Sequence, residues 1–300
     1  MEIGICGQKI QYEKREDGIC VTGCGGEEST IAIPETIEGI KVTSVGAYAF
    51  AQRQEVREIR LPDGVREIGR YAFYRCRNLE KLGLSDGILE IGGGALNGCR
   101  PGQVEIHLRR GEASALKSIV EEVRFSIRAT LHYHRGDGRV ETAQVLFPEH
   151  YEEAVENTPA RILYTSHHGS GGYYRQCFYE RKLDFAKYDA RLPWAVADEA
   201  PETVAELALK RLRFPVGLSD RARESYEGFL RDEGAAAARF LVTEEDTEGL
   251  KFLLERELLD GPAIETGIQA ALDSGKTALV SLLMEERGRR FPRKQKTFEL

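Results

Sequence analysis

Residues 45–50 read VGAYAF, and this stretch decides the fold because it recurs twice at a fixed spacing. The second copy is IGRYAF at residues 68–73, and a looser third copy is IGGGAL at residues 91–96. The same step along the chain links five further pairs: Val56 with Leu79, Ile59 with Leu82, Leu61 with Leu84, Val65 with Ile88, and Cys76 with Cys99. A repeat held in step at so many positions predicts a solenoid, whose coils bury their apolar residues only by stacking on one another.

Each position of the repeat has an expected place in a coil. The second residue of every copy is glycine, which suits a turn where a side chain would clash or where φ is positive. The aromatic ring that ends the first two copies is expected to fill the inside of the coil. Cys76 and Cys99 fall where such coils need a small, weakly polar side chain. Arg53 replaces that residue in the first coil, which predicts that this coil is partly exposed.

These residues resemble the BspA-type leucine-rich repeat over about residues 8–110. The matching positions are Ile33-Pro34, Leu61-Pro62, residues 46–50, residues 69–73 and residues 76–79. Residues 32–45 resemble the first repeat of that family, and residues 11–26 resemble the β-hairpin that caps it. The resemblance implies protein binding, commonly at bacterial surfaces.

The register of the repeat slips after Cys99. Continuing the same step, apolar residues are expected at 102, 105 and 107, but they stand at Val104, Ile106 and Leu108. We interpret the slip as the last, atypical turn of an array of three or four turns.

A different pattern follows the repeats. The sequence predicts a short helix at residues 116–122 and a hairpin of strands at residues 124–134 and 139–147 around Gly136-Asp137-Gly138. Residues 151–156 (YEEAVE) have a helical pattern, and residues 157–159 supply a plausible helix restart.

Residues 164–179 (YTSHHGSGGYYRQCFY) are the most unusual passage of the chain. Candidate ligand-binding residues in it are His167, His168, Tyr173, Tyr174, Arg175 and Gln176. They would form a loop that binds an anion or a flat ligand. The alternative, which we favour, is a glycine-rich turn into a helix whose aromatic residues pack on the rest of the domain.

The same passage and the cysteines predict no metal site, no cofactor and no catalytic residue. Adjacent histidines point in different directions in any regular structure, which argues against a metal site. A nucleophile elbow requires Gly-x-Ser-x-Gly, and this motif does not occur within residues 164–179. Cys20 and Cys24 are separated by three residues instead of two, and no second close pair with zinc-ligand spacing follows them. All six cysteines are expected to be free thiols.

Six segments with helical spacing of apolar residues end the chain, at residues 201–213, 219–231, 235–242, 247–258, 262–272 and 276–286. They weakly resemble degenerate ankyrin repeats. The predicted fold class is therefore α+β: a leucine-rich β-solenoid with an N-terminal cap, a connecting β-hairpin and α segment, and a C-terminal helical array. The expected domains are residues 1–110, 111–195 and 196–300.

The charge and composition of the chain limit the partners and the location that we expect. In 300 residues with a net charge of −7, basic residues do not outnumber acidic ones before or after residue 110, so no nucleic-acid partner is expected despite the basic stretch at 287–296. Neither a membrane span nor a leader is recognised, which predicts a cytoplasmic protein, or a cell-surface protein if the N-terminus was trimmed.

The leading functional hypothesis is a non-enzymatic scaffold that binds an unidentified protein or peptide through stacked-repeat surfaces. The alternative is a small-ligand-binding or enzymatic site at residues 164–179. The partner and the oligomeric state are not predicted.

Overall fold

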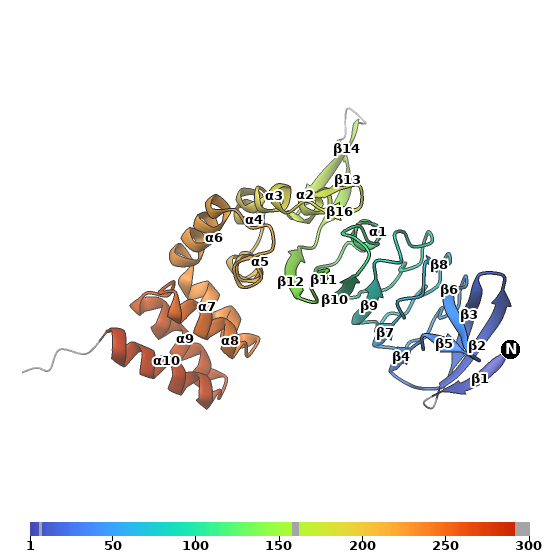
Figure 1. The fold of residues 1–300 in the computed structure, drawn as a ribbon. Helices are drawn as coiled ribbons and strands as arrows, with labels where there is room; N and C mark the ends of the chain where they lie inside the picture. The colour runs from blue at the N-terminus through green and yellow to red at the C-terminus, as the bar shows by residue number, and fades with distance from the viewer. Residues whose placement is uncertain (6–7, 158–161, 292–300) are drawn as a thin grey trace, which may run out of the picture. The chain divides into compact units, whose positions relative to one another are not determined.

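The computed structural model of the chain describes residues 1–5, 8–157 and 162–291 (Figure 1). The chain divides into two compact units, Met1–Trp194 and Ala195–Leu300. The first unit carries the β-solenoid and the second consists of helices, so the predicted α+β class is confirmed. The predicted domain boundaries at residues 110 and 195 stay predictions.

The first unit begins with a sheet that caps the solenoid. Its strands are β1 (Glu2–Ile5), β2 (Gln8–Arg15), β3 (Gly18–Gly25), β5 (Thr36–Ile37), β6 (Ile40–Val45) and β8 (Glu67–Ile68). β2 and β3 pair antiparallel, which confirms the predicted hairpin, and β3 then pairs parallel with β6. The hairpin thus joins the first coil by backbone hydrogen bonds.

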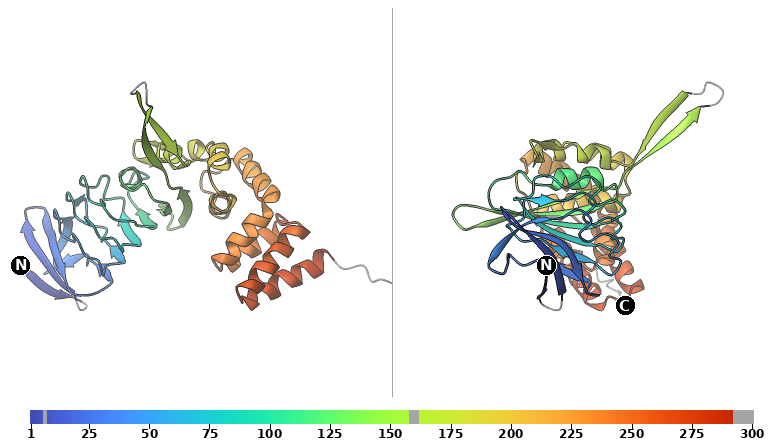
Figure 2. Two further views of the ribbon diagram at one scale, coloured as in Figure 1. Left: turned by 180° about the vertical axis from the view of Figure 1, so that it is seen from behind. Right: turned by 90° about the vertical axis from the view of Figure 1, so that its right-hand side faces the viewer.

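A second sheet runs along the coils in the order β12-β11-β10-β9-β7-β4. Its strands are β4 (Thr30–Ala32), β7 (Glu58–Arg60), β9 (Lys81–Ser85), β10 (Gln103–Leu108), β11 (Ile127–His134) and β12 (Val140–Phe147). The five strands β4, β7, β9, β10 and β11 are parallel, and Figure 2 shows them side by side. The register lines up one buried residue from each of these five strands: Ile31, Ile59, Leu82, Val104 and Ala129.

This register corrects the interpretation of the slip after Cys99. Ile59 pairs with Leu82, and Leu82 pairs with Val104. The second of these steps along the chain is one residue shorter than the first, so one coil is shortened. That coil is not the last, because β11 continues the parallel sheet beyond β10. The solenoid has about five turns, more than the three or four predicted.

The inside of the solenoid is built from the repeated residues. The rings of Phe50 and Phe73 stack with centroids 5.7 Å apart, and both are buried. The Cys76 thiol donates to the carbonyl of Phe50 at 2.9 Å, and the Cys99 thiol to that of Phe73 at 2.8 Å. The weakly polar position thus satisfies a buried carbonyl of the coil before it.

The first coil has no such thiol, as its sequence predicts. Arg53 stands there half-buried, and its guanidinium donates to the carbonyls of Cys24 and Gly26 at the end of β3. The five cysteines among the described residues are free and buried, which agrees with the expected thiols.

The predicted short helix and hairpin are confirmed as α1 (Leu116–Glu122) and as the antiparallel pair of β11 and β12. The predicted helix at residues 151–156 is wrong, because β13 (Tyr151–Asn157) pairs antiparallel with β14 (Ile162–His168). Cross-strand pairing here overrides the helical preference of its Glu and Ala residues. The predicted restart at 157–159 falls partly outside the described residues.

Short elements complete this part of the chain: α2 (Gly171–Arg175), β15 (Phe178–Tyr179), β16 (Lys182–Leu183), α3 (Phe185–Asp189) and α4 (Leu192–Asp198). Asp184 caps α3 by accepting from the backbone N–H of Lys187.

The second unit contains all six predicted helices. They are α5 (Pro201–Arg213), α6 (Asp220–Asp232), α7 (Gly234–Thr243), α8 (Thr247–Glu255), α9 (Gly261–Asp273) and α10 (Thr277–Arg290). Ser219, Asp246 and Asp260 cap three of them with side-chain oxygens. The resemblance to ankyrin repeats is not confirmed. Within the described ranges, none of the helices combines the length and apolar character that a bilayer crossing requires.

Candidate functional site: the open face of the second sheet

One face of the second sheet is buried in the solenoid, and the other is lined by polar side chains. Successive residues of a strand point to opposite faces, so the neighbours of the buried column point outward. We call these outward residues of β7 to β12 the open face. Its exposed or half-buried members are Glu58, Arg60, Lys81, Gly83, Gln103, Glu105, His107, Arg128, Thr130, His132, His134, Val140, Thr142 and Gln144.

The register of the sheet arranges the open face in rows across the strands. One row is Glu58, Lys81, Gln103 and Arg128, and another is Arg60, Gly83, Glu105, Thr130 and Gln144. Both rows carry charges of both signs, and an ion pair between an exposed Arg60 and a half-buried Glu58 at 2.7 Å links the two rows. The rows therefore present a mixed-charge surface on a rigid sheet.

A buried carboxylate fixes the chain where it leaves the open face. Asp86 accepts from the backbone N–H groups of Arg109 at 2.8 Å and Gly111 at 3.0 Å, and from that of Arg110. The Arg110 guanidinium also donates to Asp86 at 2.8 Å. Arg109 is left to pair with Asp63 at 2.7 Å. Sequence reasoning did not single out Asp86, because its partners lie one coil further along the chain.

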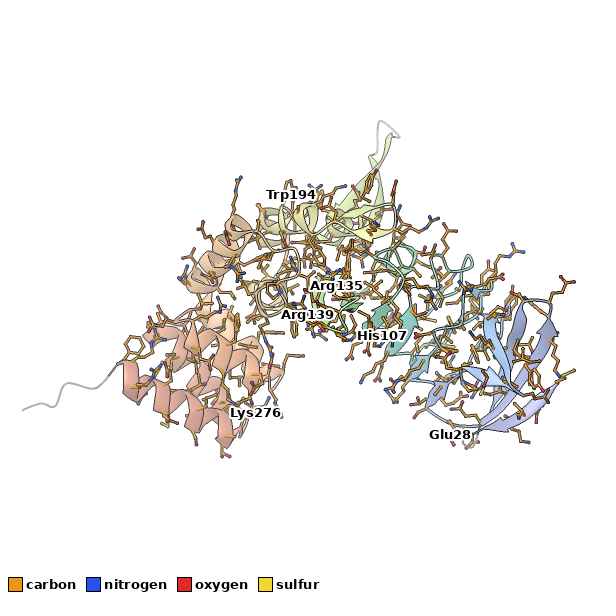
Figure 3. The ribbon with its side chains drawn as sticks, viewed as in Figure 1. Glu28, His107, Arg135, Arg139, Trp194 and Lys276 are labelled. Atoms are coloured by element: carbon orange, nitrogen blue, oxygen red, sulfur yellow. The ribbon has the colours of Figure 1, made fainter. Side chains whose placement is uncertain are left out.

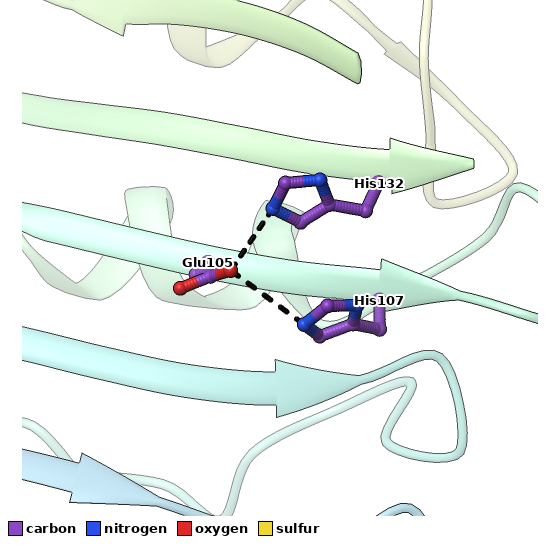
Figure 4. Close-up of side chains that lie close together, drawn as sticks. All are labelled: Glu105, His107 and His132. Atoms are coloured by element: carbon purple, nitrogen blue, oxygen red, sulfur yellow. Dashed lines mark hydrogen bonds and ion pairs between the residues drawn. The ribbon is translucent and has the colours of Figure 1, made fainter. Parts of the chain in front are cut away.

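Three of the six histidines gather on the open face. His132 Nε2 lies 2.9 Å from Glu105 Oε1, and His107 Nε2 lies 3.6 Å from the same oxygen (Figure 4). The rings of His107 and His132 stack at 4.8 Å. His134 Nε2 lies 3.0 Å from His107 Nδ1. Figure 3 shows where His107 stands in the first unit.

The cluster lowers the pKa of His107. Partial burial is the main cause, and the neighbouring His132 adds to it, while Glu105 raises the pKa. His107 is therefore held in its neutral form more strongly than a free imidazole. The sequence signal was present in His132-Tyr133-His134, because alternate residues of a strand share a face, but the place of His107 beside His132 depends on the register.

Comparison with known proteins identifies the region that carries this face. Residues 27–119 match the model of the BspA type leucine rich repeat region, in 6 copies. These residues form a BspA-type leucine-rich repeat region. They include β4, β7, β9 and β10, so Glu105 and His107 belong to the repeat region, and His132 and His134 stand on the strand that extends its sheet.

Two solved structures are similar to parts of the chain. A leucine-rich repeat protein from Bacteroides ovatus ATCC 8483 is 25% identical, with 33% of this chain and 35% of that chain covered and a TM-score of 0.26. A leucine-rich repeat protein of T. pallidum is 22% identical, with 32% of this chain and 68% of that chain covered and a TM-score of 0.24. The chain thus spans about a third of the length of the Bacteroides protein. No curated protein matches the chain.

The candidate residues predicted from sequence at 164–179 lie outside the leucine-rich repeat region and separate into two groups. His168, Tyr173 and Gln176 line a small cavity of about 160 Å³ together with His150, Gly169 and Gly172. Pockets for small-molecule ligands usually measure about 300–1,000 Å³. The backbone of His167 lies in β14, and its side chain is outside the described residues.

Tyr174 and Arg175 are buried instead, away from this cavity. The Arg175 guanidinium donates to the backbone carbonyls of Val120, Val123, Arg124, Phe125, Pro148 and Gly171 at 2.5–3.2 Å. It thereby ties α1 and the chain after it to the start of α2. Ligand binding by the six candidate residues stays a prediction, and the alternative function at this segment is not favoured.

A larger cleft of about 890 Å³ lies beside α1, between the repeat-region loop that holds Cys99 and the chain at Phe125. The Arg100 guanidinium covers the Phe125 ring at 4.1 Å. Glu122 accepts from the backbone N–H of Leu96 at 2.6 Å, and burial raises the pKa of Glu122. The polar groups of this cleft thus take part in joining α1 to the coil before it.

Proposed function

We propose that the chain is a non-enzymatic interaction scaffold that binds a protein or peptide through the open face. Leucine-rich repeat proteins are generally protein-interaction scaffolds, and the repeat region supplies about half of the open face. The observation that carries the proposal is the ordered display of polar side chains on five paired strands, β7, β9, β10, β11 and β12. Neighbouring strands lie about 4.8 Å apart, so the rows hold their side chains at a regular spacing that a partner surface can contact at several points.

The charge pattern indicates the kind of partner. The open face mixes Glu58 and Glu105 with Arg60, Lys81 and Arg128, and Val140, at the start of β12, is its one exposed large apolar residue among the described residues. Interfaces with few apolar anchors are weaker than obligate ones and depend more on charge complementarity. The expected partner is therefore a polar surface or peptide held reversibly, and its binding weakens as salt is added.

The test is site-specific photocrosslinking in the source cell. A photoreactive residue at Gln103, in the middle of the open face, is expected to capture one partner. The same residue at Glu13, exposed on β2 of the other sheet, is the matched control and is expected to capture none.

A charge-reversed variant, Arg60→Glu with Lys81→Glu, should reduce capture from Gln103 at least tenfold while the circular dichroism spectrum stays unchanged. Equal capture from both positions, or capture that ignores the charge reversal, would show that the open face is not the binding surface.

A further inference from the structure

We propose that Glu105, His107 and His132 form a binding site for one divalent transition-metal ion of the zinc type. This inference goes beyond scaffold function, which needs no metal. It starts from the position of three donor atoms, two imidazole nitrogens and one carboxylate oxygen, which all lie within 4.8 Å of one another.

The separations of the donor atoms agree with a tetrahedral ion. Zinc binds histidine nitrogen and carboxylate oxygen at about 2.0–2.2 Å, which places two tetrahedral ligands about 3.3–3.5 Å apart. The separations from Glu105 Oε1 are 2.9 Å to His132 Nε2 and 3.6 Å to His107 Nε2, on either side of that value. The two imidazole nitrogens lie within 4.8 Å of each other, and rotation of the half-exposed His107 and His132 side chains brings the three donors to tetrahedral separations.

The backbone holds the three residues in place. Glu105 and His107 are alternate residues of β10, so both point to the open face, and His132 is the direct neighbour of His107 on β11. All three are therefore on hydrogen-bonded strands of one sheet. A site on such elements loses little conformational freedom when the ion binds.

Outer contacts fix which nitrogen faces the ion. Thr142 Oγ1 lies 3.2 Å from His132 Nδ1, and His134 Nε2 lies 3.0 Å from His107 Nδ1. Metal-binding histidines usually make such a contact with the nitrogen that does not bind the metal. The Nε2 atoms of His107 and His132 therefore face Glu105 (Figure 4).

When no ion is bound, Arg109 determines which ring nitrogens of His134 and His107 carry protons. Its guanidinium has only donors, so at 3.2 Å it donates to His134 Nδ1. His134 then carries its proton on Nε2 and donates to His107 Nδ1, which keeps the His107 proton on Nε2. When a metal binds His107 Nε2, the His107 proton moves to Nδ1. The His134 proton then moves from Nε2 to Nδ1 of the same ring, and no proton is released overall. Arg109 therefore opposes binding as a positioning residue.

The donor set selects the class of metal. Imidazole nitrogen favours Zn²⁺, Cu²⁺ and Ni²⁺, whereas Mg²⁺ and Ca²⁺ take oxygen ligands. Three donors leave one tetrahedral position on the exposed side of the sheet, where water or a side chain of a bound partner completes the coordination.

The experiment titrates the full chain, kept reduced at neutral pH, with zinc chloride in a calorimeter. One Zn²⁺ per chain is expected. The variants His107→Gln and His132→Gln should each weaken binding at least tenfold. His168→Gln is the matched control, because His168 pairs with Glu153 at 3.4 Å on another sheet, and its affinity should equal that of the unaltered chain.

Cobalt distinguishes this site from the cysteines. Co²⁺ bound to nitrogen and oxygen gives visible bands without the thiolate charge-transfer band of a cysteine site. A thiolate band, no binding, or equal affinity in His107→Gln and the unaltered chain would each overturn the proposal. If a histidine variant does not fold, Glu105→Gln, altered at an exposed side chain, takes its place with the same expected loss.

Arg109 gives a test with the opposite sign. Arg109→Gln supplies an acceptor for His134 Nδ1, so zinc affinity should rise several-fold. Lys81→Gln removes the same charge from another residue of the open face and controls for simple repulsion. Weaker binding in Arg109→Gln, or an equal rise in both variants, would contradict the role given to Arg109.

Discussion

Phe73 stacks on Phe50 with their ring planes only 4° from parallel, one repeat apart in the sequence. The backbone N–H of Phe50 donates to the carbonyl of Ala72 at 2.8 Å, so the two coils are joined by hydrogen bonds at the place where their rings meet. Ring stacking and backbone pairing therefore enforce the same register between coils.

This pair predicts a large loss of stability in Phe73→Ala. Removing a fully buried ring from a packed coil costs about 3–5 kcal/mol, because the transfer free energy is lost and a cavity remains. Tyr48 is a matched control, since it also stacks on the next coil but is 58% exposed, and Tyr48→Ala should cost about 1 kcal/mol or less. Urea unfolding measures both, and equal losses would contradict a buried ring ladder.

The repeated glycine predicts a steric effect. A Cβ on Gly69 would lie 2.5 Å from the backbone nitrogen of Ala47 in the preceding coil, although its φ is not positive. Gly69→Ala should therefore destabilise the protein by about 1–3 kcal/mol through overpacking. Gly93→Ala, where a Cβ meets nothing within 4 Å, should leave the thermal midpoint unchanged or raised. If Gly69→Ala left the stability unchanged, the two coils would have to lie further apart at Gly69 than this structure places them.

The backbone contacts of Arg175 predict that this candidate ligand-binding residue has a structural role. Arg175→Met removes the donors of six backbone carbonyls, and the free energy of unfolding should fall by more than about 3 kcal/mol. Arg139, whose side chain is 77% exposed, is the control, and Arg139→Met should change it by about 0.5 kcal/mol or less. If Arg175→Met unfolds like the unaltered chain, these carbonyls do not depend on the guanidinium.

Glu122 predicts a dependence of stability on pH. Burial raises the pKa of Glu122, so the folded chain binds a proton more readily than the unfolded chain. Stability from this group is then greatest below the unfolded pKa and is lost as the pH rises through the folded pKa.

Glu122→Gln removes that dependence and keeps an acceptor for the backbone N–H of Leu96. The variant should be more stable than the unaltered chain at neutral pH, and the difference should shrink in acid. Thermal melts across this range measure it. A difference that grows in acid would mean that the carboxylate is favoured in the folded state.

Local patterns predicted the elements that each coil or helix forms by itself. The constant step of the repeat located the stacked Phe, Cys and Gly positions, and helical spacing located α5 to α10. The prediction was wrong at residues 151–156, because the pairing partner of β13 lies outside that segment. It also ended the solenoid too early, because a coil shortened by one residue looks like an ending when only the spacing is read.

The sequence by itself determined the repeat, its buried residues and the helical second unit, since each depends on residues close together in the chain. Tertiary structure alone decided the histidine cluster and the burial of Arg175. His107 meets His132 because parallel pairing of β10 with β11 sets the register between two strands that are separated by a loop and α1. Arg175 is enclosed because carbonyls from Val120 to Gly171 converge on it. Such meetings depend on how coils and loops pack, and no local spacing in the chain encodes them.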